Sequence, residues 1–340
     1  MEQELNSNPI NNKTRRKFNL KEFVKTHSLE IAAYSGFVLC LIVFSILPPI
    51  ISGPRVSIWK ANSMAVFIEQ ATVLMILAIG ASFVYMMGCM DISVGYQVGV
   101  FATLFIVITN ATNSVIVALL TIVALGIVCA VFNAFIGAYV KLPTVMSSVI
   151  LMQFFSGLMT KLYSDSSLAS RTLEKIDLTV VGSTWFRVVS IVVLILVGFY
   201  ILNYTKTGKR ARAIGANKVA ASQAGANLLK TRIICYSIFS IFLCVSAIFL
   251  IARKNGVGET DSASYQMDIM IMLLMGGMPL SGGMKCKLSN AIVGTLTYCI
   301  IDLGLGLCKV SAEYIFLVKA IIFVLIVALT CRKPGEYLPR

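Results

Sequence analysis

The sequence predicts an all-α polytopic membrane protein with about ten transmembrane helices, an internal repeat and interrupted helices. Its 340 residues are 58% hydrophobic and only 13% charged, and the mean hydropathy is +0.86. Soluble domains are roughly 45–50% apolar and about 25% charged, so this composition excludes a water-soluble fold and intrinsic disorder. The apolar residues also gather in runs of about 20, the length that a helix needs to cross a bilayer.

Ten apolar segments are candidates for these helices. They are residues 31–50, 64–87, 92–110, 114–140, 143–162, 185–204, 231–252, 266–280, 288–308 and 313–331. A charged, glycine-rich turn adjoins the third segment, and the eighth is short. No A-x-A cleavage pattern follows the first segment, so we expect an uncleaved span there and not a removable signal peptide.

The excess of basic residues predicts the orientation. The formal charge is +14, from 29 Lys and Arg against 15 Asp and Glu. If the N-terminus is cytoplasmic, ten spans put 19 basic residues in cytoplasmic segments and nine in outer ones. Cytoplasmic loops carry the Lys and Arg excess. We therefore expect both termini in the cytoplasm, the lipid bilayer as the surroundings, and no nucleic-acid partner. Trp59 and Trp185 fall near outer ends, as is typical of aromatic anchors.

The nine cysteines lie mostly inside apolar runs, and no C-x-x-C pair occurs. A single histidine, His27, cannot complete a zinc site. We interpret the cysteines as small apolar packing residues, and we predict no disulfide framework, no metal and no cofactor.

Two glycine-rich turns resemble each other. Five of nine positions are identical between residues 87–95 (MGCMDISVG) and 275–283 (MGGMPLSGG), at an offset of 188. This similarity indicates a duplicated unit, which is common among transporters, although two Gly/Met-rich stretches can also match by chance. Both turns follow an outside-to-inside span in the ten-span topology, which makes the repeat parallel. We expect Ser93 or Ser281 to cap the next helix.

The longest internal polar stretch is 205–230, with five basic residues before Val219 and no acid. It predicts a short Ala-rich helix from Lys218 to Ala224, capped by Asn217 and ended by Gly225. Such a helix is marginal alone in water and needs a partner surface. The other interpretation is an ordinary basic cytoplasmic loop.

Several motifs in order resemble the membrane permease subunits of bacterial ABC importers, in the branch of ribose, galactose and related sugar permeases. The resemblance covers the chain after about residue 60. The matching residues are Met90–Gly95 (MDISVG, where the family has G-I-D-L-S-V-G), Gly208–Arg210, Ala213–Asn217, Ala220, Gly225, Asn227, Tyr265–Asp268, Gly276–Gly277, Leu280–Gly283 and Val318–Ala320.

The resemblance implies that 205–230 is a coupling loop that docks on an ATPase subunit. Its residues there are Gly208, Arg210, Gly215, Asn217, Lys218, Ala220, Gly225 and Asn227. The family's turn residues are Asp91, Ser93, Gly95, Asp268, Gly276, Gly277, Gly282 and Gly283. The sequence departs from the family at three positions: Lys218 stands where the family usually has Glu, and Cys89 and Cys286 replace common glycines.

The resemblance also implies the partners and the domains. An ATPase dimer, a second permease subunit (the same or a different chain) and an external solute-binding protein would act with this chain in a bacterial inner membrane. The expected parts are a cytoplasmic arm at 1–30, a transmembrane permease domain at 31–331 and a cytoplasmic tail at 332–340. A monosaccharide such as ribose or galactose is the favoured solute; a nucleoside, a sugar-like signal or a branched-chain amino acid are alternatives.

Charged and polar residues inside spans are expected to face protein or water, because a charge in the bilayer is costly. The charged ones are Glu69, Asp91, Asp268, Asp302, Glu313 and Lys319. We expect Asp91 and Asp268 to fix the two turns by accepting hydrogen bonds, with direct solute contact as an alternative. Candidates for lining a path are Gln70, Gln97, Asn133 and Gln153, although interhelical packing uses such residues too.

The chain contains no G-x-x-x-x-G-K-[ST] motif and no Ser/His/Asp set, so we expect a transporter subunit and not an enzyme. ATP hydrolysis then belongs to a partner. The alternative function is a self-contained, ion-coupled secondary transporter, which also uses repeats and broken helices.

Overall fold

The computed structural model describes residues 28–139, 143–164, 172–174, 178–279 and 281–331. Residues 1–27 of the predicted arm at 1–30, with His27, and the predicted tail at 332–340 lie outside these residues. The described part forms thirteen helices and no strand, apart from one isolated bridge between Thr172 and Gly256. The predicted all-α class is therefore confirmed.

Each of the ten predicted segments forms a helix. The helices of about 20 residues or more are α2 (Ser28–Ser52), α3 (Ala61–Tyr85), α4 (Val94–Thr112), α5 (Val115–Tyr139), α6 (Thr144–Ser164), α8 (Thr184–Tyr204), α11 (Leu228–Lys254), α13 (Leu288–Leu307) and α14 (Ala312–Cys331). The shorter ones are α7 (Thr179–Gly182), α9 (Lys206–Ala216), α10 (Lys218–Gln223) and α12 (Tyr265–Met275). Among the described residues, eight helices are long and apolar enough to cross a membrane; these are all the long ones except α14.

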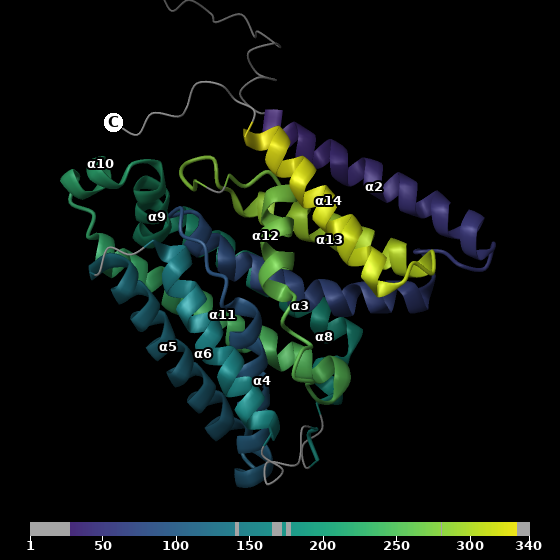
Figure 1. Ribbon diagram of the computed structural model, residues 1–340, viewed down its shortest axis with the longest axis horizontal. Coiled ribbons are helices and arrows are strands. Elements are labelled where there is room, and N and C mark those ends of the chain that lie inside the picture. The colour runs from purple at the N-terminus through teal and green to yellow at the C-terminus, as the bar shows by residue number, and fades with distance from the viewer. Residues whose placement is uncertain (1–27, 140–142, 165–171, 175–177, 280, 332–340) are drawn as a thin grey trace, which may run out of the picture.

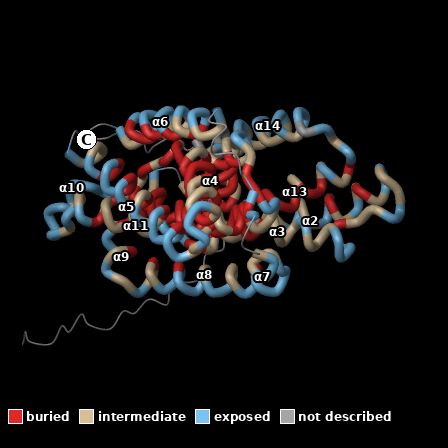
Figure 2. The backbone as a smooth tube through the Cα atoms, turned by 90° about the horizontal axis from the view of Figure 1, so that it is seen from below, coloured by how far each residue is buried: buried red, intermediate tan, exposed pale blue. Residues whose placement is uncertain are grey.

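Helices α3 and α11 form the centre of the bundle (Figure 1). In the most apolar stretch of each, 61% of residues are buried, against 17% in α2 and in α8. Figure 2 shows the same contrast, with buried chain in the middle and exposed chain at the periphery. A helix that is apolar all round belongs in a core or a membrane, which explains why α3 is buried without interruption from Ala71 to Tyr85.

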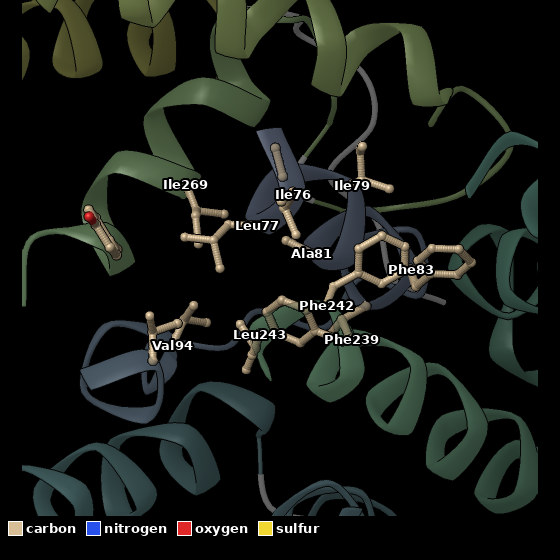
Figure 3. Packing of buried hydrophobic residues seen from close by; sticks show 14 of the residues in the cluster. Ile76, Leu77, Ile79, Ala81, Phe83, Val94, Phe239, Phe242, Leu243 and Ile269 are labelled. Carbon is tan, nitrogen blue, oxygen red and sulfur yellow. The ribbon is translucent and has the colours of Figure 1, made fainter. Parts of the chain in front are cut away.

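The core is built where α3 and α11 meet. Figure 3 shows Leu77 and Ala81 of α3 beside Phe239, Phe242 and Leu243 of α11. On one side α4, α5 and α6 pack together, and on the other α13 packs against α2 and α12 (Figure 1). The long helices thus form two groups that are joined through the central pair.

Helix α12 is an interrupted span. Its 11 residues extend about 16 Å, whereas the hydrocarbon core of a bilayer is about 30 Å thick. The segment before it enters the bundle, because Ser262 is 1% exposed and its carbonyl oxygen lies 2.6 Å from where a Cβ on Gly95 would be. Irregular chain at this depth is tolerated because protein surrounds it.

The eight cysteines whose side chains are described are free, and seven of them are buried. Cys331 lies at the end of α14, where side chains are not described. The buried thiols sit among apolar neighbours, as the sequence predicts for packing residues.

Candidate functional site

The two glycine turns end their helices in the same way. After α3, the Gly88 N–H donates to the Tyr85 carbonyl (2.9 Å) and the next N–H, of Cys89, donates to Val84 (3.3 Å). After α12, Gly277 donates to Leu274 (2.9 Å) and the N–H of residue 278 to the carbonyl of residue 273 (3.0 Å). Gly88 and Gly277 have positive φ, +68° and +81°, as this helix end requires. The structural equivalence thus has an offset of 189, one residue more than the sequence alignment.

The two turns also touch through their main chains. The Gly283 N–H donates to the Met86 carbonyl at 2.9 Å. A Cβ on Gly282 would lie 2.6 Å from that same oxygen, and a Cβ on Gly88 would lie 2.6 Å from the Ser281 carbonyl oxygen. These distances leave no room for a side chain at either glycine.

The end of α9 packs onto both turns. A Cβ on Gly215 would overlap the Met86 carbonyl oxygen and would lie 2.6 Å from the Gly283 nitrogen. We call the four residues Gly88, Gly215, Gly282 and Gly283 the glycine junction. The junction puts the predicted coupling loop and both turns at one end of the bundle.

The caps of the 205–230 segment divide it into two helices. Thr205 accepts from the Gly208 N–H (3.4 Å) at the start of α9. Asn217 lies between α9 and α10, and its side chain caps α10 by accepting from the N–H groups of Val219 and Ala220, at 3.0 and 3.1 Å. Gly225 follows α10 with φ +83°. The sequence predicted the second helix but missed α9.

Helix α10 presents most of its surface to solvent and lies at the edge of the molecule (Figure 1). Ala221 is buried, whereas Lys218, Ala220 and Arg210 of the neighbouring α9 are exposed, and Val219 is 67% exposed. Asn227 caps α11 by accepting from the Lys230 N–H at 2.9 Å. Side-chain caps at Thr205 and Asn227 therefore fix the two ends of the segment, and its middle is exposed to solvent.

A buried carboxylate, Asp91, fixes the turn between α3 and α4. It is 3% exposed and accepts from the Ser93 N–H (2.9 Å), the Ser93 hydroxyl and the Asn133 amide (2.9 Å). Gln97 donates to the Ser93 hydroxyl at 2.5 Å, and Ser147 donates to the Asn133 carbonyl oxygen at 2.8 Å. These five residues, the Asp91 cluster, join α4, α5 and α6.

The expected serine caps are wrong. Ser93 stands at the N-cap of α4, but its side chain makes no capping bond because it donates to Asp91. Ser281 does not cap α13, which begins at Leu288 after Lys287.

A cavity of about 10 Å³ adjoins the Asp91 cluster, with Tyr236 and Ser240 of α11 in its wall. This is about the space that one water molecule needs. The hydroxyls of Tyr236 and Ser240 are buried and have no hydrogen-bond partner among the described residues. The sequence analysis missed both residues, since nothing in the pattern of α11 separates them from other spans.

The acids and Lys319 in the second group of helices form a charge cluster. The Lys319 ammonium lies 2.6 Å from the Asp302 carboxylate and 4.0 Å from that of Asp268. Gln70 of α3 donates to the other Asp302 oxygen at 2.5 Å. The cluster joins α3, α12, α13 and α14. Gln70, a predicted path residue, uses its amide N–H in this cluster.

The expectation that Asp268 fixes the second glycine turn is wrong, because Asp268 lies in the first turn of α12 and this glycine turn follows the helix's last residue. The hydrogen bonds to Asp268 come from neutral donors elsewhere. Asp268 is 6% exposed and accepts from the hydroxyls of Tyr298 and Ser264, the latter at 3.1 Å. The Lys319 ammonium lies 4.6 Å from the centre of the Tyr298 ring, within cation–π range. We call Gln70, Ser264, Asp268, Tyr298, Asp302 and Lys319 the Lys319 cluster.

The remaining predicted site residues lie apart. Gln153 is exposed on α6. A Cβ on Gly276 would overlap the carbonyl of Asn290, whose amide donates to Gly277 at 3.2 Å, so this glycine serves the close packing of α12 on α13. Glu69 pairs with the buried Arg187 at 3.0 Å.

The helical architecture, the eight candidate spans and the short α12 are those of a multi-span membrane protein. Residues 63–327 match the model of the family described as branched-chain amino acid transport system / permease component, and the chain belongs to this family.

Three relatives share most of the length. The ribose import permease protein RbsC of Escherichia coli (strain K12) is 25% identical over 303 residues, which is 86% of this chain and 93% of the relative. RbsC of Bacillus subtilis (strain 168) is 24% identical over 309 residues, 89% and 93% of the two chains. The autoinducer 2 import system permease protein LsrC of Salmonella paratyphi B is 27% identical over 281 residues, 81% and 78%. No solved structure matches.

These comparisons confirm the predicted class, a permease subunit of an ABC importer, over a self-contained secondary transporter.

Proposed function

We propose that this chain forms the translocation path of an importer for a small polar solute, with a monosaccharide such as ribose as the favoured class. The named activities of the relatives, ribose import and autoinducer 2 import, support a sugar or a sugar-like molecule. A nucleoside or a branched-chain amino acid is the alternative within the class. An external binding protein delivers the solute, and the buried amides Gln97 and Asn133 contribute to the path.

In this proposal the chain holds no ATP site, and hydrolysis occurs on an ATPase dimer that docks on α9 and α10. A second permease subunit, identical or different, completes the path. The protein lies in a bacterial inner membrane with both termini in the cytoplasm. Closure of the ATPase dimer displaces the coupling loop and switches the path between outward and inward access.

The observation that carries the proposal is the glycine junction. Gly215 at the end of α9 lies against the backbones of both turns, at Met86 and Gly283. A displacement of α9 therefore acts directly on the start of the segment that leads to Asp91 and on the end of the segment that follows α12.

The test is Gly215→Ala, which adds a Cβ where two backbones already meet. We expect the variant to insert and to hydrolyse ATP with its partners, while binding-protein-dependent ribose uptake falls by about tenfold or more. Gly157→Ala is the matched control, because Gly157 is a helical glycine with nothing within 4 Å of the added Cβ.

Uptake and ATP hydrolysis are both measured in proteoliposomes that contain the ATPase and the binding protein. Normal uptake by Gly215→Ala would contradict the coupling role. Ion-driven uptake by the purified chain alone, indifferent to ATP, would contradict the importer. Transport of an amino acid or nucleoside in place of ribose would change only the solute.

A further inference from the structure

A second pocket lies at the end of the bundle away from the glycine junction. It has a volume of about 180 Å³ and is formed by residues from α2, the α2–α3 loop, α3 and α13. Because α3 runs from Ala61 towards the junction, the loop at 53–60 is at the opposite end (Figure 1). We call it the Trp59 pocket; its lining residues are Phe37, Leu41, Ser45, Ile58, Trp59, Met64, Phe67, Leu296 and Ile300.

The Trp59 pocket offers no hydrogen bond to a guest. Its two polar side-chain groups satisfy each other, because the Trp59 indole N–H donates to the Ser45 hydroxyl at 3.1 Å. The Ser45 hydroxyl in turn donates to the Leu41 carbonyl at 2.6 Å. A polar solute would therefore lose its hydration without compensation in this pocket. A hydrocarbon guest meets no such cost.

The pocket is elongated along α2. Phe37, Leu41 and Ser45 are spaced four residues apart on one face of the helix, so the wall extends about 12 Å along the helix axis. One end of the wall is at Trp59, which is 60% exposed. Tryptophan is typical of the interface between the headgroups and the hydrocarbon of a bilayer. This geometry suits a chain that enters from the headgroup level and runs into the bilayer.

The loop at the Trp59 end is basic. Arg55 and Lys60 flank Ile58 and Trp59 and are exposed, and residues 51–63 contain no acid. At the same end the Ser52 hydroxyl donates to the Leu307 carbonyl (2.8 Å), which brings the α13–α14 turn beside the loop. That turn adds one exposed cation, Lys309, and α14 begins with one exposed acid, Glu313, so their charges offset.

We propose that the Trp59 pocket binds an acyl chain of an anionic phospholipid, whose phosphate lies at Arg55 and Lys60. The apolar wall would contact the acyl chain of the lipid. The basic loop, which has no acid, would contact its headgroup, since basic residues near a bilayer surface attract anionic lipids. A second copy of this chain is a poorer occupant, because its own basic loop would face Arg55 and Lys60.

The chain has two tryptophans, which provides a direct test. In the Trp185→Phe variant, Trp59 is the sole fluorescent tryptophan, and brominated phospholipids quench it on contact. We expect brominated phosphatidylglycerol to bind about tenfold more tightly than brominated phosphatidylcholine at low salt, and the difference to shrink at high salt. Arg55→Gln/Lys60→Gln should make the two lipids equal. Leu296→Phe, which fills the pocket, should reduce quenching by both.

The matched control is Trp59→Phe, in which Trp185 reports. Trp185 is 82% exposed and lies on α8, which contributes no residue to the pocket, so we expect no preference between the two lipids there. Equal quenching of Trp59 by both lipids in the parent, or a preference that persists without Arg55 and Lys60, would overturn the proposal. Weak quenching by both lipids would show that a protein surface covers the pocket and would overturn it as well.

Discussion

Two buried acids, Asp91 and Asp268, lie at opposite ends of their segments: Asp91 is in the glycine turn after α3, and Asp268 is in the first turn of α12, before its glycine turn. Different neighbours stabilise them. The donors to Asp91 within the described residues are neutral: Ser93 and Asn133. Asp268 also has neutral donors but shares the Lys319 ammonium with Asp302. Burial is almost the same, 3% and 6% exposed. Hydrogen bonds from neutral groups therefore stabilise Asp91, whereas Asp268 has such bonds and a shared cation in addition.

The difference teaches what each cluster holds together. Removing one partner from a buried ion pair leaves an uncompensated charge, whereas removing one neutral donor leaves the other donors in place. The Lys319 cluster should thus fail as a unit, and the Asp91 cluster should weaken in steps. Substitutions of Lys319, Asp302, Asp91 and Asp268 test this contrast.

The largest expected effect follows Lys319→Met. It leaves the buried Asp268 and the partly buried Asp302 without their cation, and we expect the free energy of unfolding to fall by about 3–5 kcal/mol. Thermal unfolding of the detergent-solubilised protein measures the change. Adding Asp302→Asn should restore most of the loss, because Asp268 then resembles Asp91, with neutral donors alone. Wild-type stability of the single variant would show that the lysine does not balance these acids.

A smaller effect is expected from Asp91→Asn. The amide keeps the shape but loses the charged acceptor of the Ser93 and Asn133 bonds, which should cost about 1.5–3 kcal/mol. Asp268→Asn is the comparison, since it leaves the Lys319–Asp302 pair intact and should cost about 1 kcal/mol. The same unfolding assay applies to both variants. Equal losses would remove the distinction between the clusters.

The smallest expected effect serves as a reference for both clusters and concerns the ion pair between Lys254, at the end of α11, and Asp261 in the loop that follows. Asp261 accepts from Lys254 at 2.8 Å and from the Gly258 N–H at 2.8 Å. Partial burial opposes ionisation, but these bonds outweigh it and hold the pKa of the Asp261 carboxyl below its usual value. We expect Asp261→Asn to cost about 0.2–1 kcal/mol at neutral pH.

The sign of the pH dependence follows from that lowered pKa. The stability that Asp261 contributes is present above the pKa of the unfolded chain, 3.8, and is lost as the pH falls through the folded value. The melting temperatures of wild type and Asp261→Asn should therefore differ near pH 7 and converge as the pH falls through the lowered pKa of the folded protein. A difference that grows with acid would mean that other groups dominate.

The sequence predicted the helices well because hydrophobic length alone decides them. It also predicted Asn217 and Gly225 as the caps of α10, since those residue types act within one turn of the chain. It missed α9, because four basic residues and two glycines among its 11 residues interrupt any apolar run. It could not predict that Gln70 contacts Asp302, because the two are 232 residues apart and only packing brings them together.

The one-residue error in the repeat has the same origin. The identities align Gly88 with Gly276, whereas the helix ends align it with Gly277. An alignment by residue identity compares side chains, whereas the position of the turn depends on which glycine has a positive φ. Similarly, Ser93 has the right type and place for a cap, yet the nearby Asp91 competes for its hydroxyl.

The glycine junction has a mechanical consequence. Where two helices contact through side chains, a small movement of one helix can be absorbed by a change of side-chain rotamer, without a shift of the other backbone. At Gly215 no side chain intervenes, and the hydrogen bond from Gly283 to Met86 ties the two turns to each other. A tilt of α9 by a fraction of an ångström therefore displaces the backbone at Met86 and at Gly283 together, although these residues are far apart in the sequence.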